Sequence, residues 1–150
     1  MPKAGDILEL DTKAGLAYVQ YTHQHPLMGG VIRVLPGIFL ARPDDFHELS
    51  LRRERFVACF PVRTAVSKGI LHIVAHETIP AYAREFPIFR TGPLDGNGQV
   101  SDWWLWDGTR SWHVGKLSAA QRKFPLKSIW NDTLLATRIA DGWTPDDVPE

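Results

Sequence analysis

Two short apolar runs in the middle of the chain constrain its fold most. They cover residues 56–60 and 70–75, and both are rich in β-branched and aromatic side chains. Runs of this length, bounded by turn residues, are typical of buried central strands. We expect a turn at residues 61–63 between them. Residues 86–90 are also expected to be extended, because a proline disfavours helix in the residue before it.

Short strands and tight loops predict a meander in the first third of the chain. We expect strands over residues 7–10, 16–23 and 31–35, with a short edge segment at 38–41. Five or six such strands, strongly bent, close into a small barrel. The predicted class is α+β, mainly β: a small, strongly bent antiparallel sheet or SH3-like partial barrel with a C-terminal helix packed on it.

Three segments carry helical signals. Residues 43–53 begin with a proline and two aspartates, which suit the first turn of a helix. Residues 118–123 begin with a capping box, a serine followed three residues later by a glutamine. Residues 131–141 have an apolar stripe at helical spacing, and Asn131 or Ser128 can cap them.

Length and charge limit the possible classes of protein. We expect a single domain, residues 1–150, with an ordered core over about 5–143 and an acidic, frayed tail over 144–150. Lys+Arg and Asp+Glu both number 17, so the net charge gives no reason to expect nucleic acid or a membrane as partner. A lone cysteine, Cys59, and the lack of an apolar N-terminal segment predict a cytoplasmic protein.

Two pairs of histidines are candidate metal ligands. His23 and His25 share one face of a strand, and so do His72 and His76. Neither pair has an evident third ligand. We therefore expect neither a metal site nor a cofactor.

The sequence contains no strong catalytic motif. Cys59 lies in an apolar strand, where burial should raise the pKa of its thiol and make it inert. No nucleophile-elbow serine or phosphate-binding loop is present. An enzyme interpretation would place a site around His72, His76 and Arg90, but it lacks a nucleophile. We expect no catalytic residue and no enzyme activity.

Clustered arginines suggest one further alternative. A basic patch could form from Arg33, Arg52, Arg53 and Arg55, with neighbouring aromatic rings stacking on nucleic-acid bases. Acidic residues lie among these arginines and reduce the local positive charge. We therefore do not expect nucleic-acid binding.

Tryptophan is the most unusual part of the composition. Four of the six tryptophans lie between Trp103 and Trp112. Residues 103–106 and 111–115 should pair as a hairpin through an Asp-Gly turn. We expect the helix at 131–141 to cover the second face of this hairpin, which leaves one or two tryptophans at a surface.

Four segments carry a family resemblance. They are the opening Gly5-Asp6 strand and hairpin, residues 60–63 (FPVR), residues 86–90 (FPIFR) and residues 104–108 (WLWDG). With these the chain resembles the immunity protein 26 family of bacterial polymorphic toxin systems, over about residues 5–143. The motifs are structural in type, and none is a catalytic signature.

The resemblance implies a small cytoplasmic protein that binds a cognate secreted toxin and blocks it by occlusion. No toxin-contacting residue is carried over from the family. From their chemistry alone, we expect Asp44, Asp45, Glu48 and Trp103 to contact the partner, with the loop at 92–98 nearby. The alternative is a barrel-like module that binds a small ligand or nucleic acid. The oligomeric state and the binding face stay open.

Overall fold

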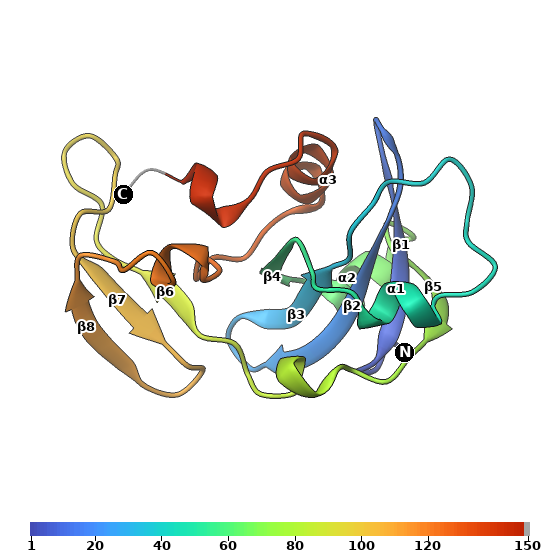
Figure 1. The fold of residues 1–150 in the computed structure, drawn as a ribbon, viewed down its shortest axis with the longest axis horizontal. Coiled ribbons are helices and arrows are strands. Elements are labelled where there is room, and N and C mark those ends of the chain that lie inside the picture. Colours follow the sequence, from blue (N-terminus) through green and yellow to red (C-terminus); the bar gives the residue numbers. More distant parts are fainter. Residues whose placement is uncertain (149–150) are drawn as a thin grey trace.

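The computed structural model describes residues 1–148, and these form a mainly β fold with two antiparallel sheets (Figure 1). Sheet A has the order β4 (Phe56–Phe60), β3 (Gly29–Val34), β2 (Gly15–His25), β1 (Asp6–Thr12) and β5 (His72–His76). Sheet B has the order β6 (Phe89–Thr91), β7 (Trp103–Trp106) and β8 (Ser111–Gly115). The α-helices are α1 (His47–Leu51), α2 (Val62–Ser67) and α3 (Asp132–Ala140). Short 3₁₀ turns are η1 (Ala81–Ala83), η2 (Gln121–Lys123) and η3 (Pro145–Asp147). The predicted class is confirmed.

Sheet A contains the meander that the sequence predicts. Strands β1, β2 and β3 follow one another, and Leu8 lies opposite Val19 while Tyr21 lies opposite Ile32. The sheet does not close into the expected barrel, because β4 and β5 form its opposite edges. It is an open, bent sheet with one apolar face toward α2 and α3.

The two apolar runs in the middle of the chain do not form neighbouring central strands. β4 pairs with β3, whereas β5 pairs with β1 at the far edge, and Ile73 on β5 is 43% exposed. The expected turn at 61–63 is instead the start of α2. Val62 and Ala65 share one face of this helix and enter the core, and this burial favours a helix over a tight turn.

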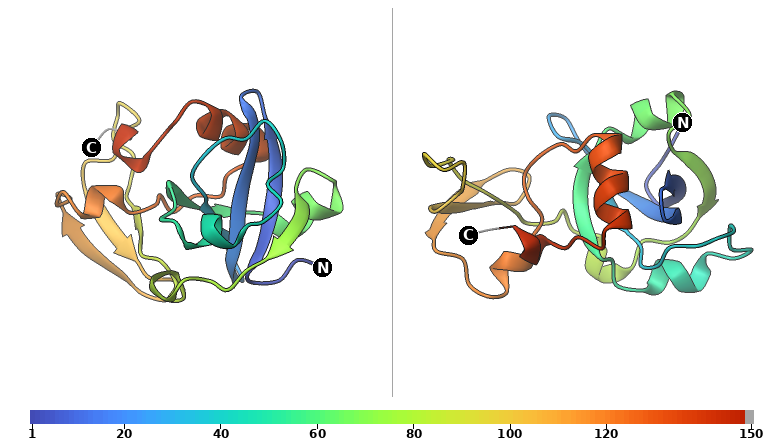
Figure 2. Two further views of the ribbon diagram at one scale, coloured as in Figure 1. Left: turned by 45° about the vertical axis from the view of Figure 1, so that its right-hand side comes forward. Right: turned by 90° about the horizontal axis from the view of Figure 1, so that it is seen from above.

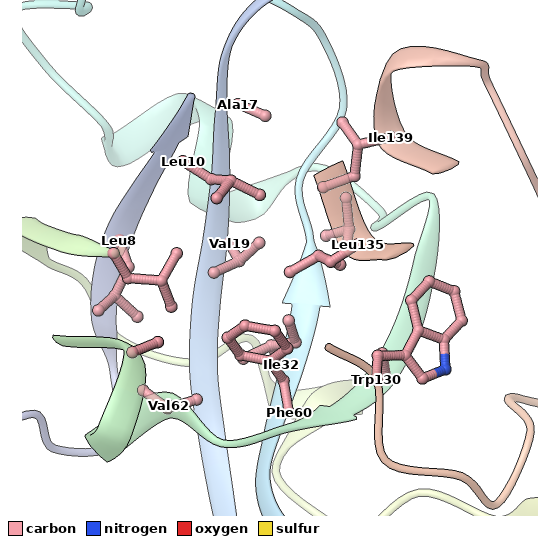
Figure 3. Packing of buried hydrophobic residues seen from close by; sticks show 14 of the residues in the cluster. Leu8, Leu10, Ala17, Val19, Ile32, Phe60, Val62, Trp130, Leu135 and Ile139 are labelled. Carbon is pink, nitrogen blue, oxygen red and sulfur yellow. The ribbon is translucent and has the colours of Figure 1, made fainter. Parts of the chain in front are cut away.

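The main core lies between sheet A and α3. Leu135 and Ile139 are fully buried, and Figure 3 shows both pointing from α3 toward the sheet. Burying a side chain of this size contributes roughly 1.5–3 kcal/mol. The predicted cap is confirmed, since Asn131 Oδ1 accepts from the Leu134 N–H at 2.7 Å. The helix does not cover the tryptophan hairpin, because its apolar stripe is used against sheet A (Figure 2).

The second face of sheet A is divided into three zones. An apolar cluster lies next to α1, at Ile7, Tyr18, Leu35 and Phe46. A second cluster joins sheet A to sheet B, at Val31, Cys59, Phe89 and Trp106. A buried polar group around Arg33 belongs to the same face of the sheet. The cluster that joins the two sheets is therefore apolar.

The chain after β8 covers sheet B before it reaches α3. Leu117, Phe124 and Leu126 belong to the cluster that buries Trp103 and Leu105. The predicted capping box is confirmed: Gln121 N donates to Ser118 Oγ at 3.2 Å, and Ser118 N donates to Gln121 Oε1 at 2.9 Å. The helical part is limited to the 3₁₀ turn η2.

The chain after α3 returns to sheet B as η3 (Figure 1). Pro145 is buried, and its carbonyl oxygen accepts a hydrogen bond from Arg90 Nη2 at 2.6 Å. The expected frayed tail over 144–150 is thus wrong for residues 144–147, which make a capped turn. Residues 149 and 150 lie outside the described residues.

Candidate functional site

The acidic residues predicted to contact a partner gather around the start of α1. The helix expected over 43–53 is shorter, because Asp45 Oδ1 accepts from the His47 N–H at 2.8 Å and holds the preceding turn in a non-helical form. Asp44, Asp45 and Glu48 are all exposed. Within residues 1–148, no Lys, Arg or His forms an ion pair with any of the three. Their charges are available to a partner.

A shallow depression of about 170 Å³ lies beside these carboxylates. It is lined by Phe39, Pro43, Asp45, Glu48, Leu49 and Arg52. Its apolar part is fixed from below, because Phe39 and Leu49 pack against the buried cluster that contains Tyr18 and Phe46. An apolar floor with a charged rim suits the stem and head group of a long basic side chain.

The loop that carries the acidic residues is held to sheet A by a buried carboxylate. Arg42 donates two hydrogen bonds to Glu9, from Nε at 2.7 Å and from Nη2 at 3.0 Å, and the Tyr18 hydroxyl donates a third at 2.9 Å. The Arg42 guanidinium lowers the pKa of Glu9, although burial opposes the shift. Burial and the nearby Glu9 raise the pKa of Tyr18. The acidic depression is therefore preorganised.

The fourth predicted contact residue, Trp103, is not at the surface. It is 2% exposed, whereas Trp104 and Trp112 are 39% and 38% exposed. Trp103 is buried because it shares one face of β7 with Leu105 and packs with Leu105 and Leu117, whereas Trp104 points to the opposite face of the strand. A partner that docks on this hairpin would contact Trp104 or Trp112 instead.

A cavity of about 460 Å³ lies beside Trp103 and the 92–98 loop. Its described lining residues are Arg90, Thr91, Gly92, Leu94, Gly98, Gln99, Val100, Trp103, Leu126, Lys127, Ser128 and Val148. Trp103 Nε1 is buried and has no hydrogen-bond partner among the residues that the structure describes. An unsatisfied buried donor costs about 1–3 kcal/mol. Apart from the Gly-rich loop, no pattern in the sequence indicates this cavity.

The arginine patch of the nucleic-acid alternative is incomplete, because Arg52 and Arg53 are exposed but Arg33 and Arg55 are used inside the fold. Arg33 is 1% exposed and uses all five of its N–H donors, and Arg55 donates to the Ile139 carbonyl at 3.0 Å. The Arg33 acceptors are Gln20 Oε1, Ser50 O, Arg52 O, Glu54 Oε1 and Tyr82 Oη. This network joins sheet A to α1 and η1. A single arginine inside the apolar run 31–35 was the signal that could have predicted its burial.

His23 and His25 cross-link segments that are distant in the sequence. His25 Nδ1 accepts from the Leu27 and Met28 N–H groups, so Nε2 carries the proton and donates to the Gly108 carbonyl at 3.0 Å. His23 Nε2 contacts the Arg84 carbonyl at 2.8 Å. Between residues 1 and 148 no group of three or more His, Cys, Asp or Glu could hold a metal ion.

The residues of the enzyme alternative are not brought together. His72 and His76 lie on the edge strand β5, where His76 Nδ1 pairs with Asp6 Oδ1 at 2.9 Å, while Arg90 lies in sheet B. Burial raises the pKa of Cys59 to about 12, as its apolar strand predicts, and Lys127 opposes this only in part.

None of the described helices is long and apolar enough to cross a bilayer.

Searches of the chain against protein-family models, curated proteins and solved structures find no match.

Proposed function

We propose that this protein is an immunity-type protein that binds a cognate bacterial toxin and neutralises it by occlusion, without catalysis of its own. The observation that carries the proposal is the acidic depression at α1, where Asp45 and Glu48 flank an apolar floor and Asp44 lies next to them. The resemblance to the immunity protein 26 family supports it. A cytoplasmic location belongs to the same proposal.

The charges of the depression indicate the chemistry of the partner. Three exposed carboxylates that form no ion pair within residues 1–148 favour a basic surface on the toxin, and complementary charge raises the rate of association and selects the partner. The apolar floor adds a place for one anchoring side chain, most favourably an arginine stem or an aromatic ring. Binding thus needs no reactive group on this chain.

The rigidity of the loop strengthens the proposal. Arg42 and Glu9 fix the loop before a partner arrives, so less conformational entropy is lost on binding. The buried Arg33 network holds the other end of α1 through the carbonyls of Ser50 and Arg52. The acidic surface is therefore held at both ends.

The test compares three tagged versions of the chain as bait in lysates of the source cells. The first is the wild type. The second carries Asp44→Asn, Asp45→Asn and Glu48→Gln, which remove three charges; the amide oxygen of the new asparagine can still accept from the His47 N–H. The third is a matched control that removes three exposed charges elsewhere, with Asp11→Asn, Asp132→Asn and Asp146→Asn.

The expected result is one stoichiometric protein that is captured by the wild type and the control but lost by the acidic-depression variant. This protein must also arrest growth when it is expressed alone. Equal capture by all three baits would remove the acidic depression from the proposal. Recovery of nucleic acid instead would favour the alternative, a nucleic-acid-binding module.

A further inference from the structure

Strand β8 forms an open edge of sheet B. It is the last strand of the sheet and lies on the side away from sheet A (Figure 1). Within residues 1–148, no strand pairs with its outer side, and its first three residues are exposed. An unpaired edge offers backbone N–H and C=O groups to which an extended segment of another chain can bind.

The hydrogen bonds of the hairpin show which of these groups point outward. Asp107 N donates to the Arg110 carbonyl at 3.1 Å, so these two residues form the hydrogen-bonded pair that closes the turn. Hydrogen-bonded and non-hydrogen-bonded pairs alternate along an antiparallel ladder. Trp112 is therefore bonded to β7, whereas Ser111 and His113 direct their N–H and C=O groups away from it. The outer edge presents donors and acceptors in the order that a further strand needs.

The composition of β8 leaves this edge unprotected. Residues 111–115 contain no proline, lysine, arginine, aspartate or glutamate, although such residues commonly block pairing at an edge. A bulge at Val114, opposite the step from Trp103 to Trp104, ends the regular row. Trp112 is 38% exposed and can pack against one side chain of a neighbouring strand. The edge thus suits a short extended segment that carries an apolar residue.

Cations flank the open edge at both ends. Arg110 precedes β8 and Lys116 follows it; both are exposed, and neither forms an ion pair in the described part of the chain. The aspartates of the hairpin lie one strand further in, at the two ends of β7. Asp107 accepts from backbone N–H groups of the turn, and Asp102 pairs with His113. The outer edge therefore favours an acidic segment.

A second copy of β8 fits this edge less well than an acidic segment does. Antiparallel pairing centred on His113 would place Arg110 of one copy opposite Lys116 of the other. Like charges directly opposite each other in a sheet are destabilising. An acidic strand is attracted at both ends instead.

We propose that the outer edge of β8 binds an extended acidic segment of another protein by strand addition. The backbone of the segment pairs with Ser111 and His113, and an apolar side chain lies beside Trp112. Acidic side chains at its two ends meet Arg110 and Lys116. This interface is separate from the acidic depression at α1, which favours a basic partner, so the two can be tested separately.

The test uses two synthetic peptides with capped ends, EEVTVTVEE and KKVTVTVKK, which differ only in charge. Binding to the ¹⁵N-labelled chain is followed by the backbone amide signals of β8, so that a peptide bound at α1 is recognised by other signals. His113→Pro removes an outward N–H group and leaves the ladder to β7 in place. His113→Ala is its matched control, because it also removes the imidazole but keeps the N–H group.

A second pair of variants tests the charge of the edge. Arg110→Glu with Lys116→Glu reverses this charge, and Arg63→Glu with Lys68→Glu makes the same change at exposed positions of α2 and its C-terminal end. This pair decides the outcome if His113→Pro does not fold.

The expected result is a saturable shift of the Ser111 and Trp112 amide signals with EEVTVTVEE, and roughly tenfold weaker binding of KKVTVTVKK at the same signals. His113→Pro should bind the acidic peptide roughly fivefold more weakly than His113→Ala does. The charge-reversed edge should prefer the basic peptide, whereas the α2 variant should keep the preference of the wild type.

The proposal is overturned if the acidic peptide gives no saturable shift, if both peptides bind the edge equally, or if the charge-reversed variant keeps the wild-type preference. Equal binding by His113→Pro and His113→Ala would exclude strand addition. Shifts of the same signals when the chain alone is concentrated would assign the edge to a second copy and contradict the proposal.

Discussion

Replacing Arg33 with methionine should remove a large part of the stability of this protein. Arg33 is buried, its partner Glu54 is 12% exposed, and its five donors satisfy acceptors on β2, α1 and η1 and in the segment between α1 and β4. Methionine fills a similar volume but leaves Gln20 Oε1 and the Ser50 carbonyl without their donor. Gln20 cannot turn away easily, because its Nε2 is held by the Glu77 carbonyl at 2.9 Å.

The size of the loss in stability follows from the buried polar and charged groups that Arg33→Met leaves without a partner. Breaking a buried ion pair by removing one partner costs about 3–5 kcal/mol, since the other charge stays buried. We expect the free energy of unfolding to fall by this amount in urea titrations at pH 7. Arg53→Met is the matched control: Arg53 is exposed, stacks on the Tyr82 ring at 4.1 Å and should cost less than about 1 kcal/mol.

The reasoning is refuted if Arg33→Met lowers the free energy of unfolding by less than about 1 kcal/mol, or no more than Arg53→Met. Either result would mean that the acceptors around Arg33 find water or other donors at little cost. A reduced slope of the urea transition would instead point to a change in the unfolded state.

Three further predictions concern single features of the fold. The thiol of Cys59, whose pKa is raised to about 12 by burial, should not react with a disulfide reagent at pH 8 until the protein is unfolded; labelling of the native protein at the rate of a free thiol would contradict this. Arg42 lowers the pKa of Glu9 below its ordinary value near 4.5, so their pairing stabilises the protein above that pH and is lost as the pH falls through the lowered pKa. The difference in unfolding free energy between wild type and Arg42→Met should therefore shrink between pH 7 and about 3, and a constant difference would rule out this linkage. Asn131→Ala removes the cap of α3 and should cost about 1 kcal/mol in thermal unfolding, whereas Asn131→Asp should cost little; equal losses would show that the side-chain acceptor is unimportant.

Local signals in the sequence predicted the elements that depend on local chemistry. The cap at Asn131 and the capping box at Ser118 form as expected. The turn after β7 also forms, with Gly108 at a φ of +98° and Phe86 so close that a β-carbon would stand 2.7 Å from its ring. The two caps and the turn itself are each decided within a few residues of the chain, whereas the contact of Gly108 with Phe86 joins distant segments.

Prediction from the sequence failed where distant segments decide the outcome. β5 has the composition of a central strand, but the pairing of β1 with β2 on one side leaves only the outer edge for it. The apolar stripe of α3 could pack on either sheet. Only the tertiary structure shows that it packs on sheet A. Alternation along β7 places Trp103 and Leu105 on one face and Trp104 on the other, but only the fold shows that the chain after β8 buries the face of Trp103. The acidic depression combines a predicted part, the three carboxylates, with the apolar floor that only the fold supplies.

The most direct test of the proposed function is protection of cells. The protein captured through the acidic depression, or its C-terminal domain, is expressed in a host from an inducible promoter, with or without this chain. The account predicts that the partner alone stops growth, that the wild type and the Asp11, Asp132 and Asp146 control restore it, and that the Asp44, Asp45 and Glu48 variant does not. A partner that is harmless alone, or one that kills equally with and without this chain, would contradict the immunity role.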